Sequence, residues 1–192
     1  MKYSLYMEST PNPSVMKFVT NRIICNDSIE INSVEDAKEI PIIESLFNFS
    51  FVKSVFISQN FISIKKSDEI DWQDIAIQMR EFILEKLNDS SSKEILIVKT
   101  DKVIQKNNPK ENQFSSIEMN IITIIDEYIK PAVESDGGNI EFKAFKNGKV
   151  EVILRGACSG CPSSSITLKQ GIESLLKQKI GDQIKEVVAF EE

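Results

Sequence analysis

Hydrophobic positions in the first half of the chain follow two different periodicities. Residues 16–20 alternate between the two sides of an extended chain, and residues 52–58 and 60–66 are rich in β-branched and aromatic side chains. These runs predict strands, the last two joined as a hairpin around Gln59 and Asn60. Residues 70–88 place apolar side chains at helical spacing, which predicts a helix packed on the strands. The first half is therefore predicted to be mixed α and β.

The second half shows the same two periodicities in a clearer order. Ser115 and Glu118 have the spacing of a capping box, so a helix is predicted to begin near Ile117 and to kink or weaken at Pro131. The run SDGGN, residues 135–139, is predicted to end this helix with glycines suited to a left-handed cap. Two alternating runs follow, joined by a turn at Asn147-Gly148, which is a strong hairpin signal.

A second amphipathic helix is predicted from Pro162 to the break at Gly181, and residues 184–190 form a last apolar strand. The order helix, strand, strand, helix, strand predicts an α-β-β-α-β module. Its three strands form one sheet, with the helices on one face.

A polar stretch without helical periodicity, residues 99–116, separates the two halves. It contains the run NNPKEN, a composition typical of turns or extended chain. The alternative is a long surface loop within one domain, but unstructured loops of this length are uncommon in compact domains. The predicted fold class is α+β, with two small domains, 1–98 and 117–192, joined by a linker at 99–116.

Composition and charge exclude several classes of function. The chain has 192 residues, 41% of them hydrophobic, and a net charge of -6 with scattered basic residues. This balance argues against a nucleic-acid partner, because phosphate contacts need clustered Lys and Arg. No apolar run approaches the roughly 20 residues that span a bilayer, and the N-terminus lacks signal-peptide features. We therefore expect a cytoplasmic protein with no membrane contact.

The candidate chemistry lies in GACSGCPSS, residues 156–164, which carries Cys158 and Cys161 in a chain with three cysteines and no histidine. An odd number of cysteines in a protein predicted to be unsecreted favours metal or redox chemistry over a disulfide framework. Zinc and iron-sulfur clusters generally take four protein ligands, and this pair supplies two. Cys25 has no cysteine near it in sequence and is interpreted as a packed hydrophobe.

The pair is predicted to lie where a strand meets the start of a helix. Amide groups and the helix dipole at such a position favour thiolates. Gly156 and Gly160 let the backbone approach whatever the sulfurs hold, and Arg155 is placed to offset part of an anionic charge. The alternatives are a glycine turn that happens to carry two cysteines and an arginine at a solvated strand end.

Several linked features resemble the C-terminal domain of NifU, which is shared by the Nfu family of iron-sulfur cluster scaffolds and carriers. They are KPAVESDGGNIEF (residues 130–142), the hairpin, GACSGCPSS and the helix after it, and together they cover about residues 116–190. Residues 1 to about 90, with ESTPNPSVMKF, look like the N-terminal domain that accompanies this module in many Nfu proteins. The resemblance implies the short, two-domain Nfu type.

The resemblance implies that a 4Fe-4S cluster is held between two chains, each of which gives Cys158 and Cys161. It also implies an upstream cluster donor and apo iron-sulfur proteins as recipients. Separating the chains removes half of the ligands at once, so the cluster can be handed on. The sulfurs are the only reactive groups implied, which predicts a carrier and not an enzyme.

Two other functions fit the cysteine pair. In a thiol-disulfide oxidoreductase, Cys158 would attack a substrate disulfide and Cys161 would resolve it. The hairpin before the motif argues against this function, because a thioredoxin-like site follows a strand of a βαβ unit. A structural zinc ion shared by two chains through four thiolates is also chemically sound.

Overall fold

The computed structural model describes residues 2–38, 40–89, 114–159 and 162–191. It divides into two compact units, Met1–Asn108 and Pro109–Glu192, which we describe separately. Most of the predicted linker falls on residues 90–113, outside the described part of the chain. The predicted linker and domain boundaries therefore stay predictions.

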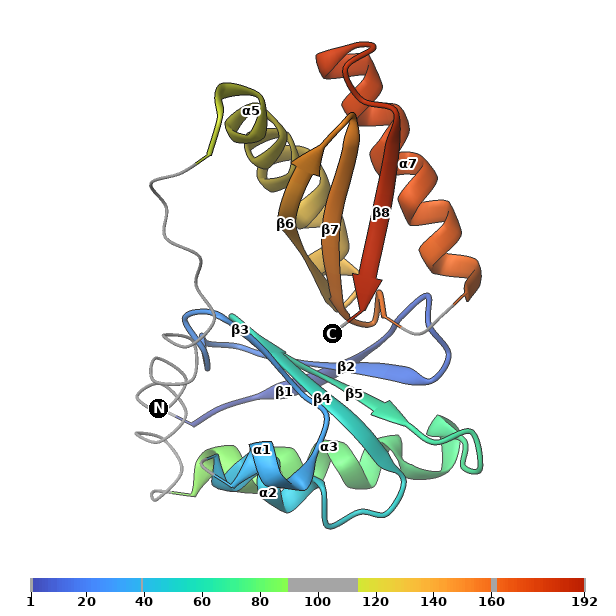
Figure 1. The fold of residues 1–192 in the computed structure, drawn as a ribbon. Coiled ribbons are helices and arrows are strands. Elements are labelled where there is room, and N and C mark those ends of the chain that lie inside the picture. The colour runs from blue at the N-terminus through green and yellow to red at the C-terminus, as the bar shows by residue number, and fades with distance from the viewer. Residues whose placement is uncertain (1, 39, 90–113, 160–161, 192) are drawn as a thin grey trace. The chain divides into compact units, whose positions relative to one another are not determined.

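The N-terminal unit is built on a five-stranded antiparallel sheet with the order β1-β2-β5-β4-β3. Its helices lie together on one face of that sheet (Figure 1). The elements are β1 (Leu5–Ser9), β2 (Val15–Thr20), β3 (Ser28–Ile31), α1 (Val34–Ala37), α2 (Pro41–Leu46), β4 (Val52–Ser58), β5 (Phe61–Lys66) and α3 (Trp72–Asn88).

The predicted hairpin and long helix are both present in this unit. Strands β4 and β5 pair around Gln59, which adopts a positive φ of 45°. Ile57 and Ile62 are paired across the two strands. Because side chains alternate along a strand, both lie on the same face of the sheet, and they share one core cluster with Ile83 of α3. Asp71 occupies the N-cap position of α3, but its side chain makes no capping hydrogen bond.

The sequence pattern gave no signal for four short elements: β1, β3, α1 and α2. Each contains four to six residues, too few for a periodicity to stand out. The proline-rich stretch before β2 forms the β1–β2 connection. There the Thr10 hydroxyl donates to the carbonyls of Asn12 at 2.9 Å and Val15 at 3.0 Å, so the loop is held by its own hydrogen bonds.

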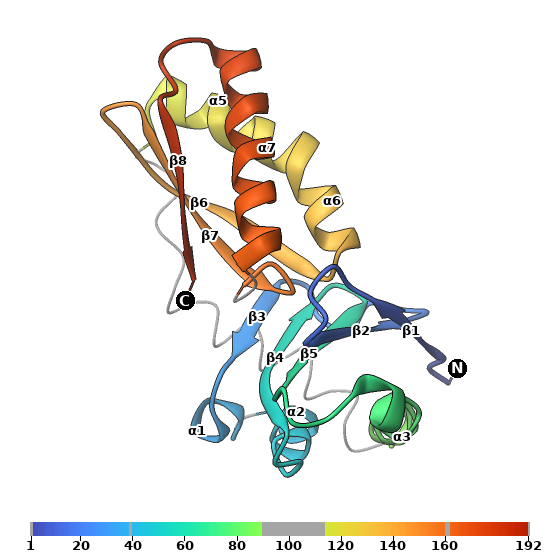
Figure 2. The same cartoon turned by 90° about the vertical axis from the view of Figure 1, so that its right-hand side faces the viewer.

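The C-terminal unit has the predicted order of helix, strand, strand, helix, strand. Its sheet has the order β6-β7-β8, and the helices cover one face (Figure 2). The elements are α5 (Ser116–Ile124), the π-helical turn η1 (Ile125–Ile129), α6 (Lys130–Ser135), β6 (Gly138–Lys146), β7 (Lys149–Gly156), α7 (Pro162–Ile180) and β8 (Glu186–Glu191).

The first helix of this unit begins and changes as predicted. The carboxylate of Glu118 accepts the backbone N–H of Ser115 at 2.8 Å and its hydroxyl at 2.7 Å. Both hydrogen bonds hold the pKa of Glu118 below its usual value, and the bond from the Ser115 hydroxyl has the larger effect. Near Pro131, which has no N–H to donate, the helix widens to a π turn in which the N–H of Lys130 donates to the Ile125 carbonyl.

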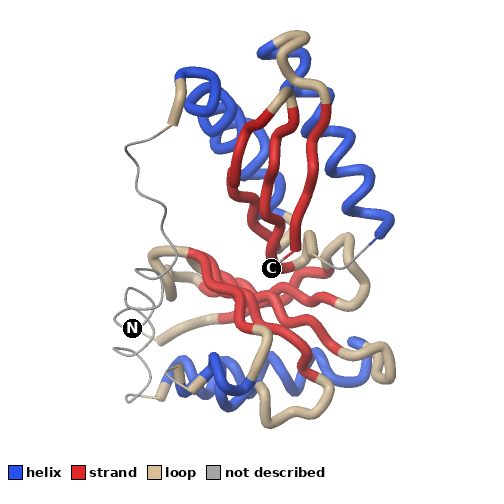
Figure 3. Tube along the Cα trace, in the orientation of Figure 1, coloured by secondary structure: helices blue, strands red, loops and turns tan. Residues whose placement is uncertain are grey.

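The sheet of the C-terminal unit mixes two pairings, and this mixture positions the cysteine loop. Strands β6 and β7 are antiparallel and joined by the Asn147-Gly148 turn, in which both residues have positive φ, whereas β7 and β8 are parallel. A parallel pair needs a crossover, which α7 provides. The described loop residues that follow β7, 157–159, lie at one end of the sheet (Figure 3).

Within the described ranges, no helix combines the length and apolar character needed to cross a bilayer.

Candidate metal centre

The loop that carries Cys158 is tied to the start of β6 by its backbone. Gly156 ends β7 with a positive φ of 64°, and the N–H of Ser159 donates to its carbonyl at 3.1 Å. The N–H of Ala157 donates across to the Gly137 carbonyl at 3.2 Å. The backbone on both sides of Cys158 is therefore held in a compact turn.

The side chain of Cys158 is buried in this turn. It is 7% exposed and belongs to the same core cluster as Ile140 and Leu154. Gly138 lies directly beside it, because a Cβ built on Gly138 would stand 2.6 Å from the Cys158 sulfur and 2.7 Å from the Arg155 carbonyl oxygen. Only glycine leaves room for the thiol at this position.

Gly138 is a site residue that the sequence analysis missed. We interpreted both glycines of SDGGN as a left-handed helix cap, but only Gly137, with a φ of 84°, has that conformation. Gly138 instead pairs with Gly156 across β6 and β7, so two glycines face each other beside the thiol. The signal was the second glycine itself, because one glycine is enough for the cap.

Arg155 is paired with an acidic side chain on the neighbouring strand. Its guanidinium pairs with the Glu141 carboxylate, which also accepts the Asn139 side-chain N–H at 3.2 Å. The Arg155 side chain is 16% exposed, so the arginine is not a solvated strand end. Glu141 compensates part of the positive charge of Arg155, so less of that charge is left to stabilise an anion in the cysteine loop.

The other predicted ligand, Cys161, and the neighbouring Gly160 lie outside the described residues. Within the part of the chain that the structure does describe, there is no group of three or more potential metal-ligating side chains. Cys25 is fully buried in the core of the N-terminal unit, in keeping with its interpretation as a packed hydrophobe. The described geometry therefore centres on Cys158.

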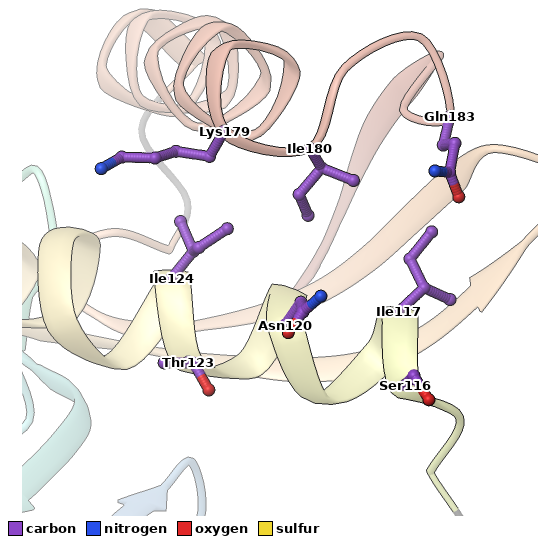
Figure 4. A pocket seen from close by; sticks show the side chains of 8 residues that line it. All are labelled: Ser116, Ile117, Asn120, Thr123, Ile124, Lys179, Ile180 and Gln183. Atoms are coloured by element: carbon purple, nitrogen blue, oxygen red, sulfur yellow. The ribbon is translucent and has the colours of Figure 1, made fainter.

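A groove in the C-terminal unit is separate from the cysteine loop. It has a volume of about 460 Å³ and runs between α5 and the end of α7. Figure 4 shows Ile117 and Ile124 of α5 facing Ile180 across it. The remaining lining side chains are mostly uncharged, and Lys179 is the one ionisable group among them. This groove lacks the sulfur and acidic groups of a metal site.

Comparison with known proteins covers both units. Residues 5–90 match the family described as "Scaffold protein Nfu/NifU N terminal", and residues 121–188 match the NifU-like domain.

Three relatives illustrate the match. NifU-like protein 4, mitochondrial, of Arabidopsis thaliana is 32% identical, with 91% of this chain and 62% of that protein covered. A NifU-like protein of Schizosaccharomyces pombe is 33% identical, with 90% and 67% covered. The protein of Homo sapiens called NFU1 iron-sulfur cluster scaffold homolog, mitochondrial, is 30% identical, with 88% and 65% covered. The chain thus spans less than two thirds of the length of the Arabidopsis and human relatives.

These relatives overturn one expectation. We expected a cytoplasmic protein, but the Arabidopsis and human relatives are named as mitochondrial. The expectation was wrong because the composition of a folded domain does not report its compartment, which is set by targeting segments.

The two family matches cover most of the chain in the order expected for the two-domain type, and the relatives match along both units. The chain therefore belongs to the Nfu family of NifU-like proteins.

Proposed function

We propose that this protein is an iron-sulfur cluster scaffold and carrier, which assembles or accepts a cluster and delivers it to apo iron-sulfur proteins. The observation that carries the proposal is the cysteine loop at the start of the β7–α7–β8 crossover. It places Cys158 ahead of the N-terminus of a 19-residue helix in a chain of this family. The names of the human and Arabidopsis relatives support the cargo and suggest that the site of action is mitochondrial.

The proposed ligands are Cys158 and Cys161 of each of two chains. Thiolates are the usual ligands of iron-sulfur clusters, and a 4Fe-4S cluster takes four of them. One chain offers two in its C-x-x-C pair, and the third cysteine, Cys25, is buried in the core of the other unit. The ligand count therefore favours a homodimer bridged by a 4Fe-4S cluster.

The shared site also explains how the cargo can leave. A ferredoxin that encloses four cysteines in one chain keeps its cluster, whereas a bridged cluster loses half of its ligands when the chains separate. Apo iron-sulfur proteins with a full set of cysteines can then take the cluster from a donor that holds it incompletely. The chain would itself be loaded by an upstream donor, and the proposal includes no catalysed bond rearrangement, so the protein is not an enzyme.

Anaerobic reconstitution with iron and sulfide tests the proposal. We expect about four irons per dimer, a Mössbauer spectrum of a 4Fe-4S cluster, and conversion from monomer to dimer on loading. A 4Fe-4S cluster on a strict monomer would contradict the shared site. Zinc as the only metal that binds stably would favour the structural zinc site, and disulfide reduction by metal-free monomers would favour the oxidoreductase.

A further inference from the structure

The buried position of Cys158 is hard to reconcile with a ligand shared between two chains. An iron atom held by both chains must lie outside both cores, yet the Cys158 side chain is 7% exposed and belongs to its own unit's core cluster. We propose that Cys158 has two positions. In the unloaded protein its thiol occupies a buried seat against Gly138, and on loading the thiol turns outward to bind the cluster. This inference rests on the proposed function of the loop.

The shape of the seat is set by backbone atoms. Gly138 contributes no side chain, and a Cβ there would overlap the Cys158 sulfur at 2.6 Å. The N–H of Ala157 is bound to the Gly137 carbonyl, and the Ser159 N–H is bound to the Gly156 carbonyl. With the backbone held on both sides, the simplest movement that exposes the sulfur is rotation about the Cα–Cβ bond of Cys158 to another staggered rotamer.

The chemical step at Cys158 involves no oxidation or reduction of the protein. The thiol leaves the seat, releases its proton to solvent and binds iron through the resulting thiolate. The loaded state then has an empty space beside Gly138. Because a ligand shifts a two-state equilibrium only through its different affinity for the two states, loading draws Cys158 outward against the packing of the seat.

The seat has a consequence for the unloaded protein. Oxidation and alkylation of a cysteine depend on exposure of the sulfur as well as on its ionisation. A seated thiol is shielded from both reactions while no cluster is present. Half of the ligand pair is thus kept reduced until it is needed.

Alkylation of the metal-free protein tests the seat. Cys25→Ala removes the buried thiol of the N-terminal unit, and N-ethylmaleimide labelling at Cys158 is followed by peptide mass spectrometry. We expect Cys158 to react at least about tenfold more slowly in the folded protein than in the same protein unfolded in urea, because local opening limits access. Gly138→Ala, added to Cys25→Ala, should fill the seat and raise the Cys158 rate by about tenfold.

Gly171→Ala is the matched control, because Gly171 lies in α7 and a Cβ there meets no atom within 4 Å. It should leave the Cys158 alkylation rate unchanged.

Either of two results would overturn the seat: folded Cys158 that reacts as fast as unfolded Cys158, or a folded Gly138→Ala protein with an unchanged Cys158 rate. If Gly138→Ala does not fold, the comparison of folded and unfolded parent protein decides. The alkylation rates need no metal. A protein with a shielded Cys158 that binds no cluster would therefore contradict the proposed function and leave the seat intact.

Discussion

The two sheets of this protein differ in how their strands are connected, and the difference determines where the loop of the candidate site forms. All neighbouring strands of the N-terminal sheet are antiparallel, and short loops join β1 to β2 and β4 to β5. The C-terminal sheet contains one parallel pair, β7 and β8, which requires a helical crossover. Only in this crossover does a described strand lead through a short loop to the start of a long helix and back to the same sheet.

The two described cysteines show what this connection changes. Cys25 and Cys158 are both buried, and the N–H of Cys25 donates to the Gln59 carbonyl at 3.0 Å, within the N-terminal unit. Cys25 lies among core side chains far from any helix start along the chain. Cys158 lies beside Gly138, four residues before Pro162, the first residue of α7. Burial is therefore common to both cysteines, and the connection around Cys158 is what makes it the proposed ligand.

The largest expected effect separates these cysteines. Cys158→Ser should abolish stable cluster loading, because each chain then offers one thiolate of the two that the proposed bridged site needs. Cys161→Ser should do the same, although this residue lies outside the described part of the chain. Cys25→Ala should leave the iron content per dimer unchanged, since a small buried hydrophobe replaces another. Iron and sulfide analysis after reconstitution measures all three.

Equal losses of iron in the three variants would contradict this assignment, provided that circular dichroism shows each variant to be folded.

The sequence predicted the elements with long or strongly marked patterns. The hairpin at Gln59-Asn60, the helix from Trp72, and the capping box of Ser115 were all confirmed. Local chemistry specifies each of these features, through turn residues, apolar spacing or a paired side chain. The order of elements in the C-terminal unit was predicted for the same reason.

Features that depend on contacts between distant residues could not be predicted from the sequence. The approach of Gly138 to the Cys158 sulfur joins residues 20 positions apart and follows from the pairing of β6 with β7. The ion pair of Arg155 with Glu141 has the same origin. The register of the two strands, which no local pattern gives in full, places these side chains together.

The second expected effect tests whether the two cores are independent. Ile83 of α3 and Ile172 of α7 are buried in separate core clusters. Ile83→Ala and Ile172→Ala should each destabilise their own unit by about 2–4 kcal/mol, the usual cost of a truncated core side chain. Each should leave the unfolding of the other unit unchanged. Denaturant unfolding followed by hydrogen exchange with mass spectrometry assigns the loss to a unit.

The matched controls lie on the same helices. Ile77 and Ile166 are 64% and 58% exposed, so Ile77→Ala and Ile166→Ala should change the free energy of unfolding by no more than about 0.5 kcal/mol. If either core substitution lowers the protection of backbone amides from hydrogen exchange in both units, the two cores do not unfold separately.

The smallest expected effect concerns the parallel crossover itself, where Glu173 of α7 holds the edge strand. Its carboxylate accepts one hydrogen bond from the Lys177 ammonium, at 2.6 Å, and another from the backbone N–H of Val187 in β8, at 3.1 Å. The hydrogen bond from Lys177 is the largest cause that lowers the pKa of Glu173 from its ordinary value of 4.5, and the Val187 bond is the next. The ionised carboxylate of Glu173 is therefore stabilised more strongly in the folded protein than in the unfolded chain.

The sign of the pH effect follows from this lowered pKa. The stabilisation from charged Glu173 is fully present above the ordinary pKa of 4.5 and is lost as the pH falls through the lowered value. Glu173→Gln should cost up to about 1 kcal/mol at neutral pH, since the carboxylate is partly exposed, and the difference from the parent protein should shrink in acid. Urea unfolding at neutral pH and in acid measures this cost. Glu127→Gln is the control for net charge, because Glu127 is exposed. A cost for Glu173→Gln that is equal at both pH values would show that shape, and not the charge of Glu173, holds β8 to the helix.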